Sequence, residues 1–239
     1  MAKPYLSIIV PVAENTELDS MLSTMKADFL LKEAMFDYEL LIVTPELNST
    51  YDSMLKFSSV LHNAKCIKAP EGDIKGLLHF GLMHATGMLR AFAFKNDFRF
   101  LKHFSDFIPL FKENEVVVGP KFNLLGANAI PQFISAVVHS PYQFQILNEE
   151  VISVLNSSLR SKDWEFFTEA HMRLSLAGKK IESVNVASLP IQYQFFDLQL
   201  WKEAFTIRIH YLLILIRNVS WFLNRKIMSV YDAIISKYY

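Results

Sequence analysis

Two near-continuous runs of apolar, largely β-branched residues constrain the fold of this sequence more than any other feature. They extend from Tyr5 to Val12 and from Tyr38 to Val43. Such runs are typical of strands that are buried on both faces, as in parallel sheets, since a strand with one wet face would alternate apolar and polar residues. Between the runs, Leu18, Leu22 and Met25 are spaced to form one face of a helix. The chain therefore starts with a strand–helix–strand unit.

The alternation of strand and helix patterns continues beyond this unit. We expect a helix over 49–61, a third strand over 65–68, a helix over 76–86 closed by Gly87 as its C-cap, a fourth strand over 88–94, a helix over 104–112 and a fifth strand over 115–119. This order predicts an α/β fold with a mostly parallel sheet flanked by helices. In such sheets, ligands bind at the carboxyl ends of the strands.

The following part of the chain has a different composition. Residues 122–159 are apolar, aromatic and rich in amides, and they contain no Lys or Arg. A helix is expected over 163–177, with Asp163 as its N-cap and Gly178 as its C-cap. The segment after it is extended, and Pro190 favours an edge strand there because proline cannot donate to a sheet ladder.

Three acidic or thiol side chains lie outside the expected strand ends. Glu165 and Glu169 lie four residues apart and share one face of the expected helix. An exposed acidic helix start explains them better than a pair for acid–base catalysis. Cys66 is the one cysteine of the chain and falls in an expected strand, so we interpret it as a buried, inert thiol.

The last part of the chain is basic and helical. Lys+Arg and Asp+Glu balance at 24 each over the whole chain, which argues against a general nucleic-acid binder. Residues 201–239, however, hold six Lys and Arg and two Asp and Glu. We divide the chain into a domain of residues 1–197 and an amphipathic basic tail of residues 198–239.

The tail predicts an association with a surface. A basic amphipathic helix with aromatic residues can lie in a membrane interface, and we expect Arg208, Arg217 and Trp221 to face it. The longest apolar run of the tail is far shorter than the roughly 20 residues of a membrane span. A helix packed on the domain, or a contact with a protein partner, is the other interpretation. With a single cysteine and no signal-peptide pattern, we expect a cytoplasmic protein that is peripheral to the membrane.

Several segments together resemble family-two glycosyltransferases, especially the dolichol-phosphate mannosyltransferase-like branch. They are, in chain order, Ser7–Asn15, Tyr38–Val43, Gly81–Gly87, Phe104–Leu110, Glu115–Phe122, Trp164–Glu169 and Ala177–Asn185. The resemblance covers about residues 5–190 and implies the GT-A (Rossmann-like) fold, with transfer of a sugar from a nucleotide-sugar to a prenyl or dolichol phosphate or a glycan. It also implies that Pro11, Glu14 and Thr44 lie by the nucleotide and that Lys121 contacts the acceptor. For Glu14, an ordinary solvated turn is an equally good interpretation.

The sequence departs from this family at its metal motif. The family's fourth strand ends in Asp-x-Asp, and the aligned residues here are Phe94, Lys95 and Asn96. Mg²⁺ and Mn²⁺ bind hard oxygen ligands, usually carboxylates. Asp97 lies one residue beyond the motif, a shift that turns a strand side chain to the opposite face. Asn96 and Asp97 therefore form at best a weakened site for Mg²⁺ or Mn²⁺ with a nucleotide-sugar, and Lys95 is a candidate for pairing with the diphosphate directly.

Three functions remain open from the sequence. The first is a membrane-associated glycosyltransferase-like protein with weakened or lost activity. The second is a non-catalytic relative that acts as a partner or scaffold subunit at the membrane, which the missing carboxylates favour. The third is a soluble transferase with a non-lipid acceptor. The sequence assigns no catalytic residue.

Overall fold

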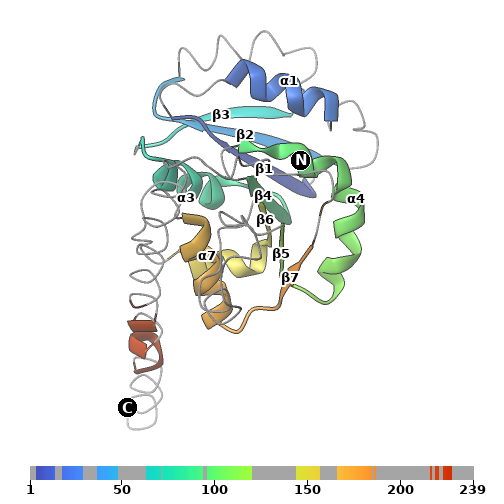
Figure 1. Ribbon diagram of the computed structural model, residues 1–239. Helices are drawn as coiled ribbons and strands as arrows, with labels where there is room; N and C mark the ends of the chain where they lie inside the picture. Colours follow the sequence, from blue (N-terminus) through green and yellow to red (C-terminus); the bar gives the residue numbers. More distant parts are fainter. Residues whose placement is uncertain are drawn as a thin grey trace, which may run out of the picture.

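A twisted sheet with helices on both faces forms the centre of the molecule (Figure 1). The computed structural model describes residues 4–13, 18–28, 37–47, 63–70, 72–93, 96–119, 144–156, 166–184 and 186, with residues 216, 219–220 and 223–227 of the tail. Within these residues the sheet has seven strands in the order β3-β2-β1-β4-β6-β5-β7.

The strands and helices follow the alternation that the sequence predicts. The strands are β1 (Leu6–Pro11), β2 (Tyr38–Thr44), β3 (Ala64–Lys68), β4 (Leu89–Ala93), β5 (Val116–Val118), β6 (Phe144–Asn148) and β7 (Ile181–Ser183). The α-helices are α1 (Leu18–Asp28), α3 (Ile74–His84), α4 (Phe104–Phe107), α6 (Ile152–Leu155) and α7 (Phe166–Leu176). Short 3-10 helices are η3 (Phe98–His103), η4 (Ile108–Lys112) and η5 (Glu149–Val151).

The mostly parallel sheet is confirmed, with one strand that runs the other way. β1 is parallel to both β2 and β4, β2 is parallel to β3, and β5 is parallel to β7. β6 is antiparallel to its neighbours β4 and β5. It lies in the aromatic segment that the sequence left without an element. Its first four residues are all buried, but one of them is the polar Gln145, which interrupts the continuous apolar run by which β1 and β2 were recognised.

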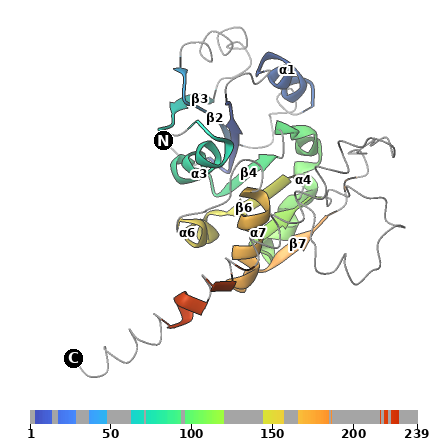
Figure 2. The same cartoon turned by 60° about the vertical axis from the view of Figure 1, so that its left-hand side comes forward.

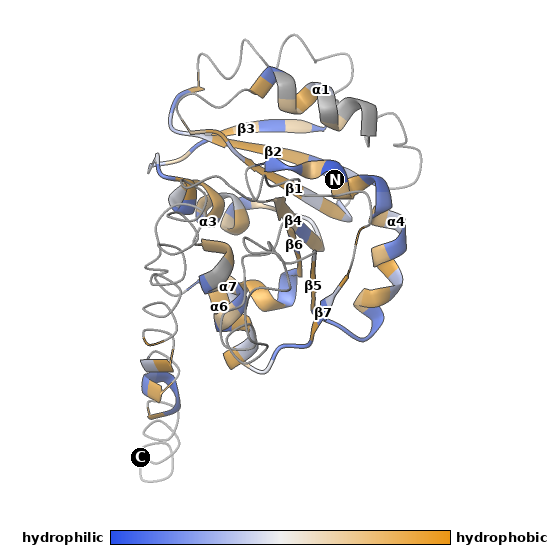
Figure 3. Cartoon of the chain, viewed as in Figure 1, coloured by the Kyte–Doolittle hydropathy of each residue, from blue (hydrophilic) through white to orange (hydrophobic). Residues whose placement is uncertain are grey.

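Two apolar layers hold helices on the sheet (Figures 2 and 3). On one face, Leu22 and Met25 of α1 are buried in a cluster with Ile8 and Leu40 of the central strands. This cluster also takes in side chains of η3 and α4. On the other face, α3, α6 and α7 contribute to a second cluster that contains Ile9, Leu41 and Val43. Successive residues of β1 and β2 thus enter opposite layers, which explains why both strands are apolar throughout.

Two glycines that the sequence assigned to helix C-caps have different roles. Gly178 has φ +73°, its N–H donates to Ser175 O, and the Lys179 N–H donates to Leu174 O, so the expected C-terminal turn of α7 is confirmed. The assignment of Gly87 is wrong, since α3 ends at His84 with Ala85 as its C-cap. Gly87 is instead packed on β1. A Cβ added there would lie 2.5 Å from Ser7 Oγ and 2.6 Å from Ser7 N.

Other boundaries also change. The segment 104–112 is not one helix but α4 followed by η4. Pro109 lies at the start of η4, and a proline lacks the N–H that a continuous α-helix needs. α3 begins before the expected residue because the Asp73 carboxylate accepts the Gly76 N–H at 2.7 Å. The helix expected over 49–61, the N-cap Asp163 and the edge-strand residue Pro190 lie outside the described residues.

The expected exposed acidic start of α7 is wrong for Glu169. This side chain is 1% exposed, and Arg173 Nη2 donates to its Oε1 at 2.8 Å. Arg173 is itself buried. The two residues lie four apart on one helix, so the ion pair forms within α7, and both side chains are buried. Glu165 lies outside the described residues.

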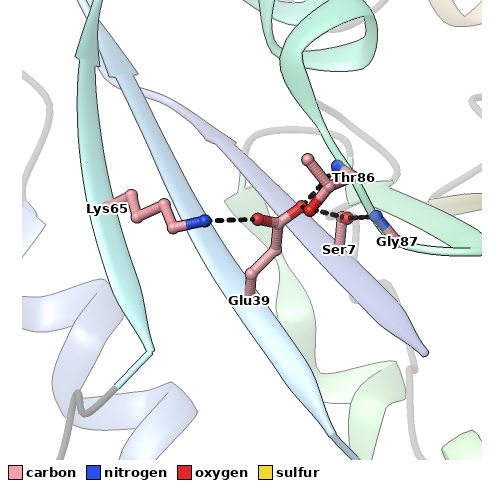
Figure 4. A network of polar contacts seen from close by, with 5 residues as sticks. All are labelled: Ser7, Glu39, Lys65, Thr86 and Gly87. Carbon is pink, nitrogen blue, oxygen red and sulfur yellow. Dashed lines mark hydrogen bonds and ion pairs between the residues drawn. The ribbon is translucent and has the colours of Figure 1, made fainter. Parts of the chain in front are cut away.

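A buried carboxylate ties the amino-terminal ends of the central strands together (Figure 4). Glu39 of β2 is 3% exposed, and its Oε1 accepts hydrogen bonds from Ser7 Oγ at 2.6 Å and from the Thr86 N–H at 2.6 Å. Lys65 Nζ of β3 donates to Oε2 at 3.2 Å, and the Gly87 N–H donates to Ser7 Oγ at 2.7 Å. Three strands and the link between α3 and β4 are thus joined by one side chain.

We predict that Gly87→Ala destabilises the protein by about 1–3 kcal/mol, as overpacking of a filled core does. The added methyl group meets the backbone of Ser7, which cannot move without breaking the β1 ladder. Urea unfolding followed by circular dichroism measures the change. Gly72→Ala is the matched control, because among the described residues its Cβ would meet Pro45, at an ordinary 3.5 Å. Equal stability of the two variants would contradict the packing role of Gly87.

A second prediction concerns the stability of the protein at low pH. Burial raises the pKa of Glu39, but the hydrogen bonds from Ser7, Thr86 and Lys65 outweigh this, and the pKa is lowered from 4.5 overall. The stabilisation is therefore present above pH 4.5 and is lost as pH falls through the folded-state pKa. We expect Glu39→Gln to lower the free energy of unfolding by about 1–3 kcal/mol at neutral pH. The difference from the wild type should narrow below pH 4.5, whereas the exposed control Glu113→Gln stays near the wild type throughout. A gap that does not change with pH would contradict the prediction.

Candidate functional site

The point where β1 meets β4 is the topological switch point of the sheet. The chain runs outward from β1 through β2 to β3 on one side, and β4 adds to the other side of β1. Because these four strands are parallel, their carboxyl ends share one edge of the sheet. In open α/β sheets the crevice at such a point is where ligands bind. Pro11 and Thr44, both expected near a nucleotide, end β1 and β2 at this edge.

Asn96 follows β4 and contacts the end of β1 at the switch point. Its Nδ2 donates to the carbonyl oxygen of Pro11 at 2.9 Å, so two residues that the sequence assigned to the site lie together. Asn96 has φ 56°, and among the described residues it is the one non-glycine with positive φ. Asparagine is among the few residues that tolerate this left-handed conformation. Its Oδ1 is buried with no hydrogen-bond partner among the described residues, so an acceptor is left over at this point. Strained backbone of this kind gathers at functional sites.

Asp97 is engaged by a cation that the sequence analysis missed. Arg99 Nε donates to Asp97 Oδ1 at 2.7 Å, and Arg99 Nη2 donates to Oδ2 at 2.6 Å. Oδ1 also accepts the Arg99 N–H at 3.3 Å and so caps η3. Both carboxylate oxygens thus face one guanidinium, and the pair is partly exposed. The arginine two residues after the aspartate was the available sequence signal.

These residues do not fit a divalent cation. The strand end supplies one carboxylate, and a guanidinium already neutralises it. Among the described residues, no group of three or more His, Cys, Asp or Glu side chains could hold a metal ion. Mg²⁺ and Mn²⁺ need several oxygen ligands, and a neighbouring cation opposes their binding. The described residues at this edge therefore do not supply a site for metal-assisted chemistry.

Thr44 shapes the turn after β2. Its hydroxyl donates to Glu46 O at 3.0 Å and accepts the Glu46 N–H at 3.2 Å, and the side chain is buried. A threonine hydroxyl that bonds the backbone two residues on is a turn-forming contact. The hydroxyl at the expected nucleotide position is thus already used to hold the chain against β2.

Aromatic rings fill the sheet beneath this edge. Phe92 of β4 lies edge-on to Phe167 of α7 with ring centroids 4.9 Å apart. On the other face, Phe100 of η3 stacks on Phe144 of β6 at 4.1 Å. A Cβ at Gly119 would lie 2.2 Å from the Phe144 ring, so glycine lets the ring reach the end of β5. The helix η3, which follows the Asn96–Asp97 turn, is thus packed on this aromatic layer through Phe100.

The remaining predicted site residues are not placed by the structure. Glu14, Phe94, Lys95, Lys121, Arg208, Arg217 and Trp221 lie outside the described residues. Their assignments to the nucleotide, the diphosphate, the acceptor and the membrane stay predictions.

Comparisons with known proteins show the fold. No family model matches the sequence, and no curated protein matches it. Glucosyl-3-phosphoglycerate synthase from Mycobacterium tuberculosis, solved with Mn²⁺, uridine-diphosphate and glucosyl-3-phosphoglycerate, is similar with a TM-score of 0.61 and 11% identity. The match covers 90% of this chain and 80% of that one. TarS 1-349 from S. aureus is similar with a TM-score of 0.51 and 17% identity, over 75% of this chain and 58% of that one.

A third similar structure belongs to a synthase with a different name from the first two proteins. It is 4-diphosphocytidyl-2C-methyl-D-erythritolsynthase from Anaerococcus prevotii, with a TM-score of 0.54 and 13% identity over 86% of this chain and 99% of that one. At these identities the likenesses show the GT-A-type, Rossmann-like fold and no more.

We predict that Asn96→Ala destabilises the protein more than Asn96→Gly. Both variants lose the bond to Pro11, but alanine also pays for φ 56°, which costs an L-residue about 1–2 kcal/mol. Urea unfolding of both variants gives the difference directly. An alanine variant as stable as the glycine variant would show that this backbone conformation is not retained in solution.

Proposed function

We propose that this chain binds a nucleotide-sugar at the β1–β4 switch point and holds its diphosphate with cations of the protein in place of a divalent ion. We further propose that sugar transfer is weakened or lost. The observation that carries this proposal is the Asn96–Asp97–Arg99 turn, which brings a strained polar residue and a guanidinium to the sheet edge where ligands bind.

Arg99 suits the diphosphate role because of its chemistry and its setting. A guanidinium presents paired N–H donors that match phosphate oxygens, and it keeps its charge at every physiological pH. The pair with Asp97 is partly exposed, and such pairs contribute about 0–1 kcal/mol. A diphosphate carries more charge than one carboxylate and can therefore displace it. Lys95 remains a second candidate cation for the same group.

The similar structures support the ligand class. Structures of the Mycobacterium tuberculosis synthase have been solved in complex with uridine-diphosphate and with uridine-diphosphate-glucose. By the resemblance to the dolichol-phosphate branch, we propose a prenyl phosphate or glycan as the acceptor, with Lys121 near it. The tail would then hold the protein at the membrane surface where such an acceptor lies.

A second candidate function is a non-catalytic partner subunit at the membrane. It is favoured by the same carboxylate: Asp97 is bound to Arg99 on both oxygens, which removes a group that an active site would use. In this alternative the fold serves as a scaffold and the sheet edge takes no nucleotide.

Calorimetric titration with uridine-, guanosine- and cytidine-diphosphate, with Mn²⁺ or with EDTA, separates these functions. We expect at least one nucleotide to bind equally well in EDTA. Arg99→Met should weaken that binding about tenfold or more, since a charge-assisted hydrogen bond contributes about 1.5–3 kcal/mol. Asp97→Asn should strengthen it, because the carboxylate that competes with the diphosphate for Arg99 is removed. Lys112→Met, an exposed cation of η4, is the matched control and should bind like the wild type.

Two results would contradict the proposal. Binding that requires Mn²⁺ would show that a metal site exists after all. A folded protein that binds none of the nucleotides would favour the partner subunit, as would purification in a stable complex with another protein.

A further inference from the structure

The helix η3, which follows the Asn96–Asp97 turn, has a regular pattern of burial. It leads from the end of β4 into α4 on the face of the sheet that also carries α1 (Figure 1). A 3-10 helix has three residues per turn, so side chains three positions apart lie above one another. Phe98 and Leu101 form one such side and are buried, and Phe104, the next residue in the series, is buried as well. Phe100 lies on a second side and is also buried.

The third side of η3 carries two cations. Arg99 and Lys102 are both partly exposed and lie one turn apart, about 6 Å along the helix axis. The direction of this side is fixed, because the other two sides of η3 are packed into the core and Phe100 stacks on Phe144. η3 starts directly after Asp97, so the two cations begin at the carboxyl edge of the sheet and continue one turn away from it.

The two cations differ in their acidic neighbours. Both carboxylate oxygens of Asp97 accept hydrogen bonds from Arg99. Among the described residues no ion pair involves Lys102. Asp106, four residues further on, lies instead 3.6 Å from His103 Nδ1. Asp97, Arg99 and Lys102 together are therefore positive, and the charge of Lys102 acts on a ligand without first being separated from a carboxylate.

We propose that Lys102 is a second phosphate-binding residue, and that Lys102 and Arg99 each hold one phosphate of the diphosphate of the nucleotide-sugar. This role rests on the nucleotide binding proposed above. Arginine offers a phosphate paired N–H donors, whereas lysine acts as a point charge on a flexible stem. Both side chains are long, so two cations one turn apart can converge on two linked phosphates.

A phosphate on the acceptor would offer Lys102 the same chemical group. The short separation of Lys102 from Arg99 favours the linked phosphates of one ligand. Two separate anions bound one helical turn apart would repel each other, and each would lose its own freedom of motion on binding. A diphosphate brings both charges together in a single binding event.

Calorimetric titration in EDTA tests the role of Lys102. The probes are the diphosphate of uridine, guanosine or cytidine that the wild type binds most tightly, and its monophosphate. We expect Lys102→Met to weaken binding of the diphosphate about tenfold, because a charge-assisted hydrogen bond is lost. Binding of the monophosphate should fall by about twofold or less, since Arg99 still holds its single phosphate.

Two control variants accompany this titration. Lys102→Arg keeps the charge and should bind the diphosphate nearly as well as the wild type. Lys112→Met removes an exposed cation of η4 and should bind like the wild type. Thermal unfolding checks that every variant is folded.

The outcomes separate this role from the proposed function. Diphosphate binding that Arg99→Met weakens and Lys102→Met leaves unchanged would overturn the role of Lys102 and keep the nucleotide site. Equal losses in Lys102→Met and Lys102→Arg would also overturn it, because they would assign Lys102 a structural role. Loss of inorganic phosphate binding to the nucleotide-saturated Lys102→Met variant, with diphosphate binding intact, would assign Lys102 to an acceptor phosphate instead. A folded wild type that binds no nucleotide would contradict both proposals.

Discussion

The rest of the structure depends on how the buried carboxylate of Glu39 is satisfied. A carboxylate that is removed from water costs several kcal/mol unless donors surround it. Here the donors come from β1, β3 and the link before β4, so the charge is stable only when these segments are assembled. Because the strands run parallel, fixing their amino ends also sets where their carboxyl ends meet. The position of Pro11 beside Asn96 follows from contacts at the opposite edge of the sheet.

The amino-terminal and carboxyl-terminal edges of the parallel strands hold their carboxylates in different ways. Glu39 is held by residues distant in sequence and is closed to solvent. Asp97 is held by a neighbour two residues away and remains partly exposed. Separating Glu39 from Ser7 and from the Thr86 N–H requires β2 to part from β1 and from the link between α3 and β4, whereas separating Asp97 from Arg99 requires one side chain to turn. Only the second kind of pair can exchange for a ligand without loss of the fold, which is why the switch point is the better functional candidate.

Sequence patterns predicted the strands that form nearly continuous apolar runs, such as β1 and β2, and the turn at Gly178, which is closed by local hydrogen bonds. A prediction was wrong where the residue's contact partner lies far along the chain. Gly87 follows a helix as a C-cap does, yet its partner is Ser7, 80 residues away. Arg99 and Arg173 were missed as partners of carboxylates, although both lie within four residues of them. The short separation in sequence did not show whether each of these ion pairs lies at the surface or in the core.

The charge of the Asn96–Arg99 turn also bears on what kind of chemistry this edge can support. A leaving diphosphate is stabilised in a transition state by fixed charges that are not already neutralised. A divalent ion supplies two such charges, while the Asp97–Arg99 pair sums to zero until the aspartate turns away. Separating the pair therefore reduces the free energy of ligand binding. The interaction that remains stabilises the bound ligand more than a transition state, so it favours binding over acceleration of a reaction. For the proposed nucleotide-sugar ligand, a turn built in this way would therefore favour binding over sugar transfer.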